Sequence, residues 1–233
     1  MDASGRGLLP EDEATHLTRV LRLGVGAAIE VFDGRGGVWT ATVAEVSRHE
    51  VAVQSGVPVT APVEPRVRLR LVASALKGDK LDDVVRDAAM VGVHDIQVVV
   101  TQRSELSMAA LLRSGRAERW RRIAVSSLKQ CGRSVLPTVP DPVTLTQWAS
   151  TEPTGLLLVM CEPAAGQGRR ISDVPRAAEV TLVVGPEGGW TPEELALLTE
   201  LGAVAVKCGG LTLRADAAAL VGVAALCEGW QVW

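Results

Sequence analysis

The stretch "LVVGPEGGWTPEE", residues 182–194, passes from an apolar run through a glycine-rich segment into the start of a helix. Pro186 fixes its own φ and has no N–H, whereas Gly185, Gly188 and Gly189 tolerate backbone angles closed to other residues and leave their peptide groups open. We expect Gly185 to end a strand where a side chain would crowd a ligand. The local chemistry leaves two interpretations open: a stiff strand–helix turn, or one wall of a ligand site.

The residues after this segment predict a well-specified helix start. Thr191 is the expected N-cap, Pro192 occupies the first helical position, and Glu194 is placed to reach back to the N-cap amide. Because the loop is then held at both ends, its backbone should adopt one fixed conformation.

Strand-like and helical patterns alternate from residue 68 to the end of the chain. The runs "GLLLVMCE" and "TLVVG" are typical of a parallel sheet that is covered on both faces. This alternation predicts an α/β domain, with Gly92 ending its first helix. The predicted strands cover 68–74, 96–100, 155–162, 181–185 and 203–208, and the predicted helices cover 81–91, 116–133, 192–202 and 215–230.

Three loops leave the carboxyl ends of predicted strands, which is where parallel α/β sheets bind their ligands. These loops are residues 160–163, 185–189 and 208–214. Neither GxGxxG nor GxxxxGK[ST] occurs, so the sequence supports neither a dinucleotide-binding fold nor a P-loop NTPase.

The first 60 residues differ in pattern from the rest. Alternating strand-like runs flank Asp33 to Gly37, which predicts a hairpin; a phosphate loop is disfavoured because no helix follows. A short helix is expected over 11–23 and a further strand over 50–59. Pro62 and Pro65 lie in a predicted linker, so we place the domain boundary between residues 65 and 66.

The composition excludes several classes of protein. No stretch approaches the roughly 20 apolar residues of a membrane span, and the N-terminus lacks the form of a signal peptide. The four cysteines are far apart and the three histidines are scattered, so we expect neither disulfides nor a metal site. These features predict a cytoplasmic protein with no membrane partner.

The net charge of −3 hides a basic segment. Residues 66–136 carry 14 Lys and Arg against 7 Asp and Glu, whereas 1–65 carry 5 against 9 and 137–233 carry 5 against 11. Local clustering of this kind favours a polyanionic partner, although a solvated helix face is the alternative. The candidate phosphate-binding residues are Arg113, Arg116, Arg119, Arg121, Arg122 and Arg133, with Arg19, Arg22 and Arg35 near the N-terminus.

Five segments, taken in order, resemble one family. They are "HLTRVLRLGVGAAIEVFDGRG", "KGDKLDDVVRDAAMVGV", "KQCGR", "VVGPEGGWTPEE" and "LTLRADAAAL". Together they span nearly the whole chain and resemble the ribosomal small subunit methyltransferase E family, the 16S rRNA (uracil-N3)-methyltransferases of the knotted SPOUT superfamily.

The resemblance implies a fold, a cofactor and partners. Residues 1–65 would form a small PUA-like β-barrel domain that binds RNA, and residues 66–233 an α/β methyltransferase domain with a trefoil knot. The resemblance also implies a homodimer, 16S rRNA of the small ribosomal subunit as substrate, and S-adenosyl-L-methionine as methyl donor. The implied cofactor-binding residues are Met160, Glu162, Gly185, Glu187, Gly188, Gly189, Cys208, Gly209, Leu211, Leu213 and Ala218.

Methylation of uracil N3 requires that a proton leaves and that negative charge on the ring is stabilised. A guanidinium at the carbonyl oxygens would stabilise that charge, and we assign this role to Arg214. Asp216 is either a proton acceptor or a first-turn helix anion.

Where the family usually reads Leu-Arg-Thr-Glu-Thr-Ala, residues 213–218 read "LRADAA". Two alternatives therefore stay open. One is an RNA-binding or ribosome-assembly module with weakened catalysis. The other is a SPOUT enzyme that methylates another RNA atom, such as a ribose 2′-hydroxyl.

Overall fold

A computed structural model describes residues 4–48, 50–163 and 168–233. The chain divides into two compact units. The N-terminal unit holds the residues up to Pro62 together with Arg133–Val135, and the C-terminal unit holds Val63–Gly132 and Leu136–Trp233.

The N-terminal unit is an antiparallel sheet with a short helical segment. Its strand order is β1 (Arg6–Leu8), β4 (Val51–Pro58), β3 (Val38–Val46) and β2 (Ala28–Phe32). The predicted β2–β3 hairpin is confirmed, and the Asp33 carboxylate closes it by accepting hydrogen bonds from the amides of Arg35 at 2.7 Å and Gly37 at 2.9 Å. The short helix expected over 11–23 is confirmed over most of its length, as α1 (Glu11–Thr15) followed by a π-helical turn, η1 (His16–Val20).

The C-terminal unit is built on a sheet in which every neighbouring pair of strands is parallel. The strand order is β7-β6-β5-β10-β8-β11-β9. The strands are β5 (Arg68–Ser74), β6 (Asp95–Val100), β7 (Val143–Thr144), β8 (Leu156–Met160), β9 (Arg169–Arg170), β10 (Glu179–Val184) and β11 (Val204–Lys207). The predicted parallel α/β sheet is therefore confirmed.

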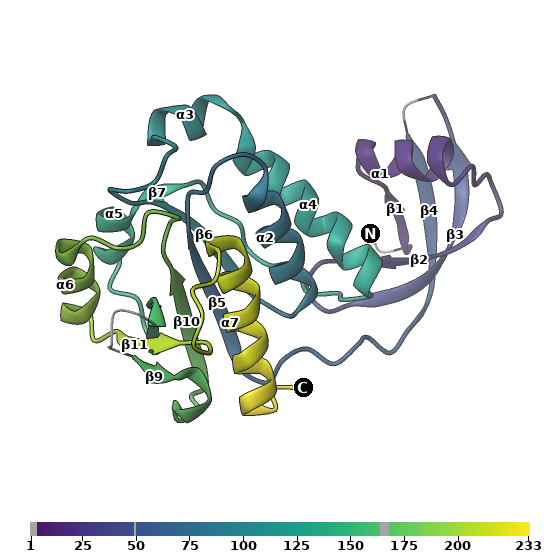
Figure 1. Cartoon of the computed structure of the whole chain (residues 1–233). Coiled ribbons are helices and arrows are strands. Elements are labelled where there is room, and N and C mark those ends of the chain that lie inside the picture. The colour runs from purple at the N-terminus through teal and green to yellow at the C-terminus, as the bar shows by residue number, and fades with distance from the viewer. Residues whose placement is uncertain (1–3, 49, 164–167) are drawn as a thin grey trace. The chain divides into compact units, whose positions relative to one another are not determined.

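Helices cover both faces of this sheet (Figure 1). They are α2 (Lys80–Met90), α3 (Met108–Arg113), α4 (Arg116–Cys131), α5 (Leu145–Ala149), α6 (Pro192–Glu200) and α7 (Ala215–Trp230), with a 3₁₀ turn, η3, at Ile171–Asp173. The sequence patterns predicted α2, α4, α6 and α7 but neither α3 nor α5.

Alternation along the central strands explains why both faces are apolar. Successive strand residues point to opposite faces. Leu182 and Met160 lie against Gly222 of α7, where an added Cβ would come within 2.7 Å of each side chain. Val183 and Val159, the strand neighbours of Leu182 and Met160, point to the opposite face of the sheet. There they pack in a hydrophobic cluster with residues of α5 and α6. Because each strand must bury both sets of side chains, β8 and β10 read as continuous apolar runs.

Candidate functional site

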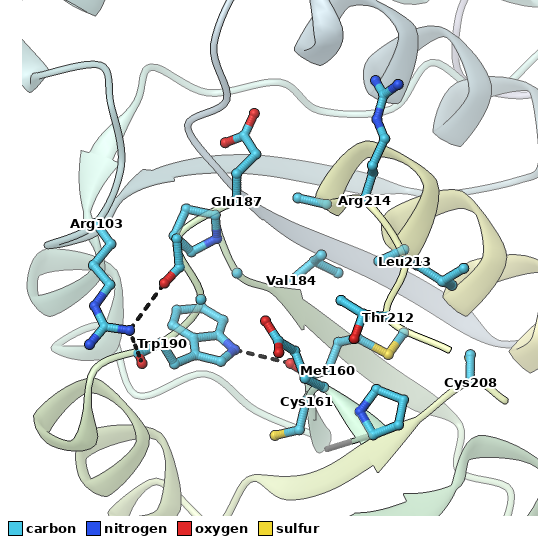
Figure 2. Close-up of a pocket in the computed structure, with 18 of the residues that line it drawn as sticks. Arg103, Met160, Cys161, Val184, Glu187, Trp190, Cys208, Thr212, Leu213 and Arg214 are labelled. Atoms are coloured by element: carbon cyan, nitrogen blue, oxygen red, sulfur yellow. Dashed lines mark hydrogen bonds between the residues drawn. The ribbon is translucent and has the colours of Figure 1, made fainter. Parts of the chain in front are cut away.

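A cavity of about 510 Å³ lies at the carboxyl ends of β8, β10 and β11, three neighbouring strands of the C-terminal unit. The loops that follow these strands line it, as Figure 2 shows. Most of the residues proposed from the sequence to bind a cofactor meet here. They are Met160, Glu162, Gly185, Glu187, Gly188, Gly189, Cys208, Leu211, Leu213 and Ala218, and the rim carries Arg214. Gly209, in the same loop as Cys208, and Asp216 do not line the cavity.

Trp190 fixes the start of the loop after β10. Its indole Nε1–H donates to the carbonyl of Met160 at 3.0 Å, so the ring joins the ends of two neighbouring strands. A Cβ on Gly185 would lie 2.9 Å from Cε2 of this indole. A side chain at Gly185 would therefore crowd Trp190, and the expectation that it would also crowd a ligand stays a prediction.

The predicted capping box after this loop is confirmed. The Thr191 hydroxyl accepts from the Glu194 amide at 3.2 Å, and Glu194 Oε2 accepts from the Thr191 amide at 3.0 Å. Glu194 Oε1 also accepts from the amide of Gln102 at 2.7 Å. Glu194 is 5% exposed, and its hydrogen bonds join the helix start to the loop that follows β6.

Glu187 joins the cavity loop to the first residue of α2. Lys80 Nζ donates to Glu187 Oε1 at 2.7 Å. Partial burial raises the pKa of Glu187, but the hydrogen bond and charge of Lys80, with the backbone amides of Glu187 and Lys77, outweigh burial and leave the pKa below its usual value. Glu187 is therefore a carboxylate near neutral pH.

Arg214 and Asp216 pair with each other at the beginning of α7. Arg214 Nε donates to Asp216 Oδ1 at 3.1 Å, and Nη2 donates to Oδ2 at 2.7 Å. The Arg214 side chain is 69% exposed and its guanidinium points out of the cavity (Figure 2). Both Asp216 oxygens accept hydrogen bonds from Arg214. Each oxygen keeps a further lone pair, so the ion pair orients the carboxylate and leaves its role as a proton acceptor a prediction.

The arginines proposed to bind RNA differ in their partners. On α4, Arg116 Nη1 donates to the Gly78 carbonyl at 2.6 Å, and Arg119 forms an ion pair with Asp82 at 2.6 Å. Arg121 pairs with Glu118 and Asp141 and donates to the Val139 carbonyl. Among these candidates, the exposed ones are Arg113, Arg119 and Arg122 in the C-terminal unit and Arg19, Arg22 and Arg35 in the N-terminal unit.

Arg133 differs from these arginines because it is only 6% exposed. Its guanidinium is therefore not presented on the surface of this chain.

The cysteines at the cavity are poor nucleophiles. Burial raises the pKa values of Cys161 and Cys208, so both are thiols near neutral pH. Within the described ranges, no group of three or more His, Cys, Asp or Glu side chains is placed to hold a metal ion. Among the same residues, no helix combines the length and apolar character needed to cross a membrane.

Arg103 lines the cavity but was not among the residues proposed from the sequence. It follows β6, which was predicted as a buried strand, so the rule that ligands lie beyond carboxyl ends could have drawn attention to it. No sequence pattern pointed to Lys80, because Glu187, its partner in the ion pair, is distant in the sequence.

Comparisons with known proteins agree with this geometry. A family model described as an RNA methyltransferase domain matches residues 63–227, and one described as an RNA methyltransferase PUA domain matches residues 9–54. Ribosomal RNA small subunit methyltransferase E of Synechocystis is 33% identical over 215 residues, covering 90% of this chain and 68% of the relative. The enzyme of that name from Mycobacterium tuberculosis is 29% identical over 236 residues, covering 97% of this chain and 87% of the relative.

A solved structure is similar over nearly the full length. It is ribosomal RNA small subunit methyltransferase E from Neisseria gonorrhoeae bound to S-adenosyl methionine, with a TM-score of 0.85 and 27% identity, covering 98% of this chain and 93% of that one. Fold, family models and relatives agree over both units. The chain belongs to the ribosomal RNA small subunit methyltransferase E family.

Proposed function

We propose that this protein transfers the methyl group of S-adenosyl-L-methionine to N3 of a uracil in 16S rRNA. The observation that carries the proposal is the cavity built from the loops after β8, β10 and β11, with Arg214 at its rim. The relative from Neisseria gonorrhoeae was solved with this methyl donor bound.

The residues at the cavity suit the methyl donor. A volume of about 510 Å³ is within the usual range for small-molecule sites. Met160, Leu211, Leu213 and Ala218 offer apolar surface for a flat ring, and the Glu162 carboxylate suits a ligand that carries positive charge. These side chains, with the backbone of residues 185–189, would hold the donor, which supplies an electrophilic methyl group.

Arg214 has the chemistry to stabilise the acceptor. Loss of the N3 proton leaves negative charge on the uracil carbonyl oxygens, and a guanidinium at the cavity rim would stabilise that charge. Asp216 would act on the same step by orienting Arg214. Acceptance of the N3 proton by Asp216 is the alternative role, because each of its oxygens keeps a lone pair besides the one that binds Arg214.

RNA would bind through the two units together. We propose that residues 1–65 form an RNA-binding PUA-like domain and that residues 66–233 form the methyltransferase domain. Exposed arginines in both units offer contacts to phosphates, and such contacts fix the position of an RNA without reading its sequence. We place the reaction in the cytoplasm, where ribosomal RNA of the small subunit would be available to the enzyme.

We further propose a trefoil-knotted SPOUT fold for the C-terminal unit. The strand order supports this proposal, because after β11 the chain returns past β8 and β10, and α7 then packs against β10, β5 and α2.

We also propose a homodimer formed through α7. Ala217, Val221 and Ala224 lie on one exposed face of this helix, and Val221 is 40% exposed. Exposed apolar surface of this kind suits an interface with a second copy of the chain.

The function can be tested by nucleoside analysis of 16S rRNA from a strain that lacks this protein. The proposal expects loss of 3-methyluridine and its return with the wild-type gene but not with Arg214→Ala. Loss of a ribose-methylated nucleoside instead would favour the other methyltransferase reaction. A protein that shows no binding of S-adenosyl-L-methionine in calorimetry would favour the RNA-binding module.

A further inference from the structure

The loop after β6 is a rigid support beside the cavity. Its residues 101–104 bond to one another: the Thr101 amide donates to Ser104 Oγ at 3.1 Å, the two hydroxyls lie 2.8 Å apart, and the Ser104 amide donates to the Thr101 carbonyl at 3.2 Å. Thr101 is also buried. Arg103 therefore extends from a turn whose own backbone has little freedom.

Arg103 donates to two carbonyls of the cavity loop. Its Nη1 lies 3.0 Å from the Gly188 carbonyl oxygen and 3.2 Å from the Trp190 carbonyl oxygen, as the dashed lines in Figure 2 show. Nη1 of a guanidinium carries two hydrogens, so it can serve both acceptors at once.

These two bonds complete the restraint of two peptide planes. The Gly188 carbonyl and the Gly189 amide share one plane, and the Gly189 amide donates to the Pro186 carbonyl at 2.9 Å. The Trp190 carbonyl and the Thr191 amide share another, and the Thr191 amide donates to Glu194 Oε2. Arg103 thus binds the carbonyl oxygen of each peptide group. The N–H of each peptide group is bound by the Pro186 carbonyl or by the Glu194 carboxylate.

Close packing adds to the hydrogen bonds. A Cβ on Gly188 would lie 2.9 Å from Cβ of Arg103 and 3.3 Å from its carbonyl oxygen. Only glycine lets the two loops approach this closely, so the position of residue 188 depends directly on the loop that carries Arg103.

We propose that Arg103 is a positioning residue for the cofactor, because it fixes the backbone of residues 188–190 in the shape that the methyl donor requires. This inference rests on the proposed function. Arg103 acts through the loop and takes no part in the transfer of the methyl group.

The test compares three variants by calorimetric binding of S-adenosyl-L-methionine and by the kinetics of RNA methylation. Arg103→Met keeps the length of the side chain but cannot donate, and it should raise the Kd for the donor about 10- to 100-fold, the usual effect of losing charge-assisted hydrogen bonds. Arg103→Lys should be intermediate, because its ammonium can restore donation. Gly188→Ala should also weaken binding, since its Cβ would push against Arg103.

If Arg103 only positions the cofactor, Arg103→Met should leave the binding of RNA unchanged. The KM for RNA should match that of Arg176→Met, a control at an exposed arginine. The double variant Arg103→Met, Gly188→Ala should bind the donor about as weakly as the weaker single variant, because both changes disturb one contact.

Two results would overturn the inference while the proposed function stands. One is a donor affinity equal to wild type in Arg103→Met. The other is a rise in the KM for RNA as large as the rise in the Kd for the donor. Should Arg103→Met fail to fold, the same measurements on Arg103→Lys and Gly188→Ala test the inference. A wild-type protein that does not bind the donor contradicts the proposed function itself.

Discussion

Arg214 and Asp216 form a two-pronged ion pair at the first turn of α7, with nitrogen–oxygen distances of 3.1 and 2.7 Å. The two residues are two positions apart in the sequence. The arginine side chain is 69% exposed, whereas the aspartate side chain is 21% exposed. The guanidinium is therefore restrained in direction while one side of it faces solvent, where a substrate could reach it. Under the proposed function, Asp216 would orient Arg214.

Replacing Arg214 by alanine should reduce kcat for RNA methylation about 10²- to 10³-fold, the usual effect of removing one group that stabilises a developing negative charge. The Kd for S-adenosyl-L-methionine should stay unchanged, because the guanidinium points out of the cavity. Single-turnover kinetics and calorimetry measure the two quantities. A variant that methylates at the wild-type rate would show that Arg214 has no part in the chemistry.

Replacing Asp216 by asparagine should reduce kcat but preserve the shape of the pH–rate profile. Asparagine keeps the size of the side chain and removes the charge that orients Arg214. A general base would behave differently, because its loss removes the acidic limb of the profile. Disappearance of that limb in the variant would assign proton transfer to Asp216 and contradict the orienting role.

The Lys80–Glu187 pair should make stability depend on pH in the acid range. The pKa of Glu187 in the folded chain is below its usual 4.5, so its contribution is fully present above that value and is lost as the pH falls through the lower, folded pKa. The thermal midpoint of wild type should exceed that of Glu187→Gln near neutral pH, and the difference should shrink on acidification. A difference that stays constant into the acid range would mean that the charge of Glu187 is not what stabilises the loop.

Two neighbouring arginines of α4 provide a matched test of RNA contact. Arg121 is committed to Glu118, Asp141 and the Val139 carbonyl, whereas Arg122 is exposed and makes no hydrogen bond or ion pair with any residue that the structure describes. Arg122→Gln should lower the slope of log Kd for RNA against log salt by about 1, as expected for one lost phosphate contact. Arg121→Gln should change the slope less, and equal effects would contradict this distinction.

Local sequence signals predicted most of the C-terminal unit. The capping box at Thr191 and Glu194 depends on neighbouring residues, and the apolar runs of β8 and β10 are long enough to show their pattern. By contrast, β7 and β9 have two residues each, too few for a period to be visible. These strands exist because longer neighbours provide the pairing partners.

The candidate site could be placed from the sequence, but its internal contacts could not. The loops after strands identified where residues meet, because the carboxyl ends of parallel strands share one edge. The bonds from Lys80 to Glu187 and from Arg103 to Gly188 join residues 107 and 85 positions apart. Such pairs depend on the order of strands in the sheet, which periodicity does not reveal.

The central claim is best tested by methyl transfer with the purified protein. Small ribosomal subunits from a strain that lacks the enzyme are incubated with S-adenosyl-L-methionine carrying a deuterated methyl group, and the nucleosides of the 16S rRNA are analysed by mass spectrometry. We expect deuterated 3-methyluridine, formed by wild type and nearly absent with Arg214→Ala. Deuterium in a ribose-methylated nucleoside, or none in the RNA although the donor binds, would contradict this claim.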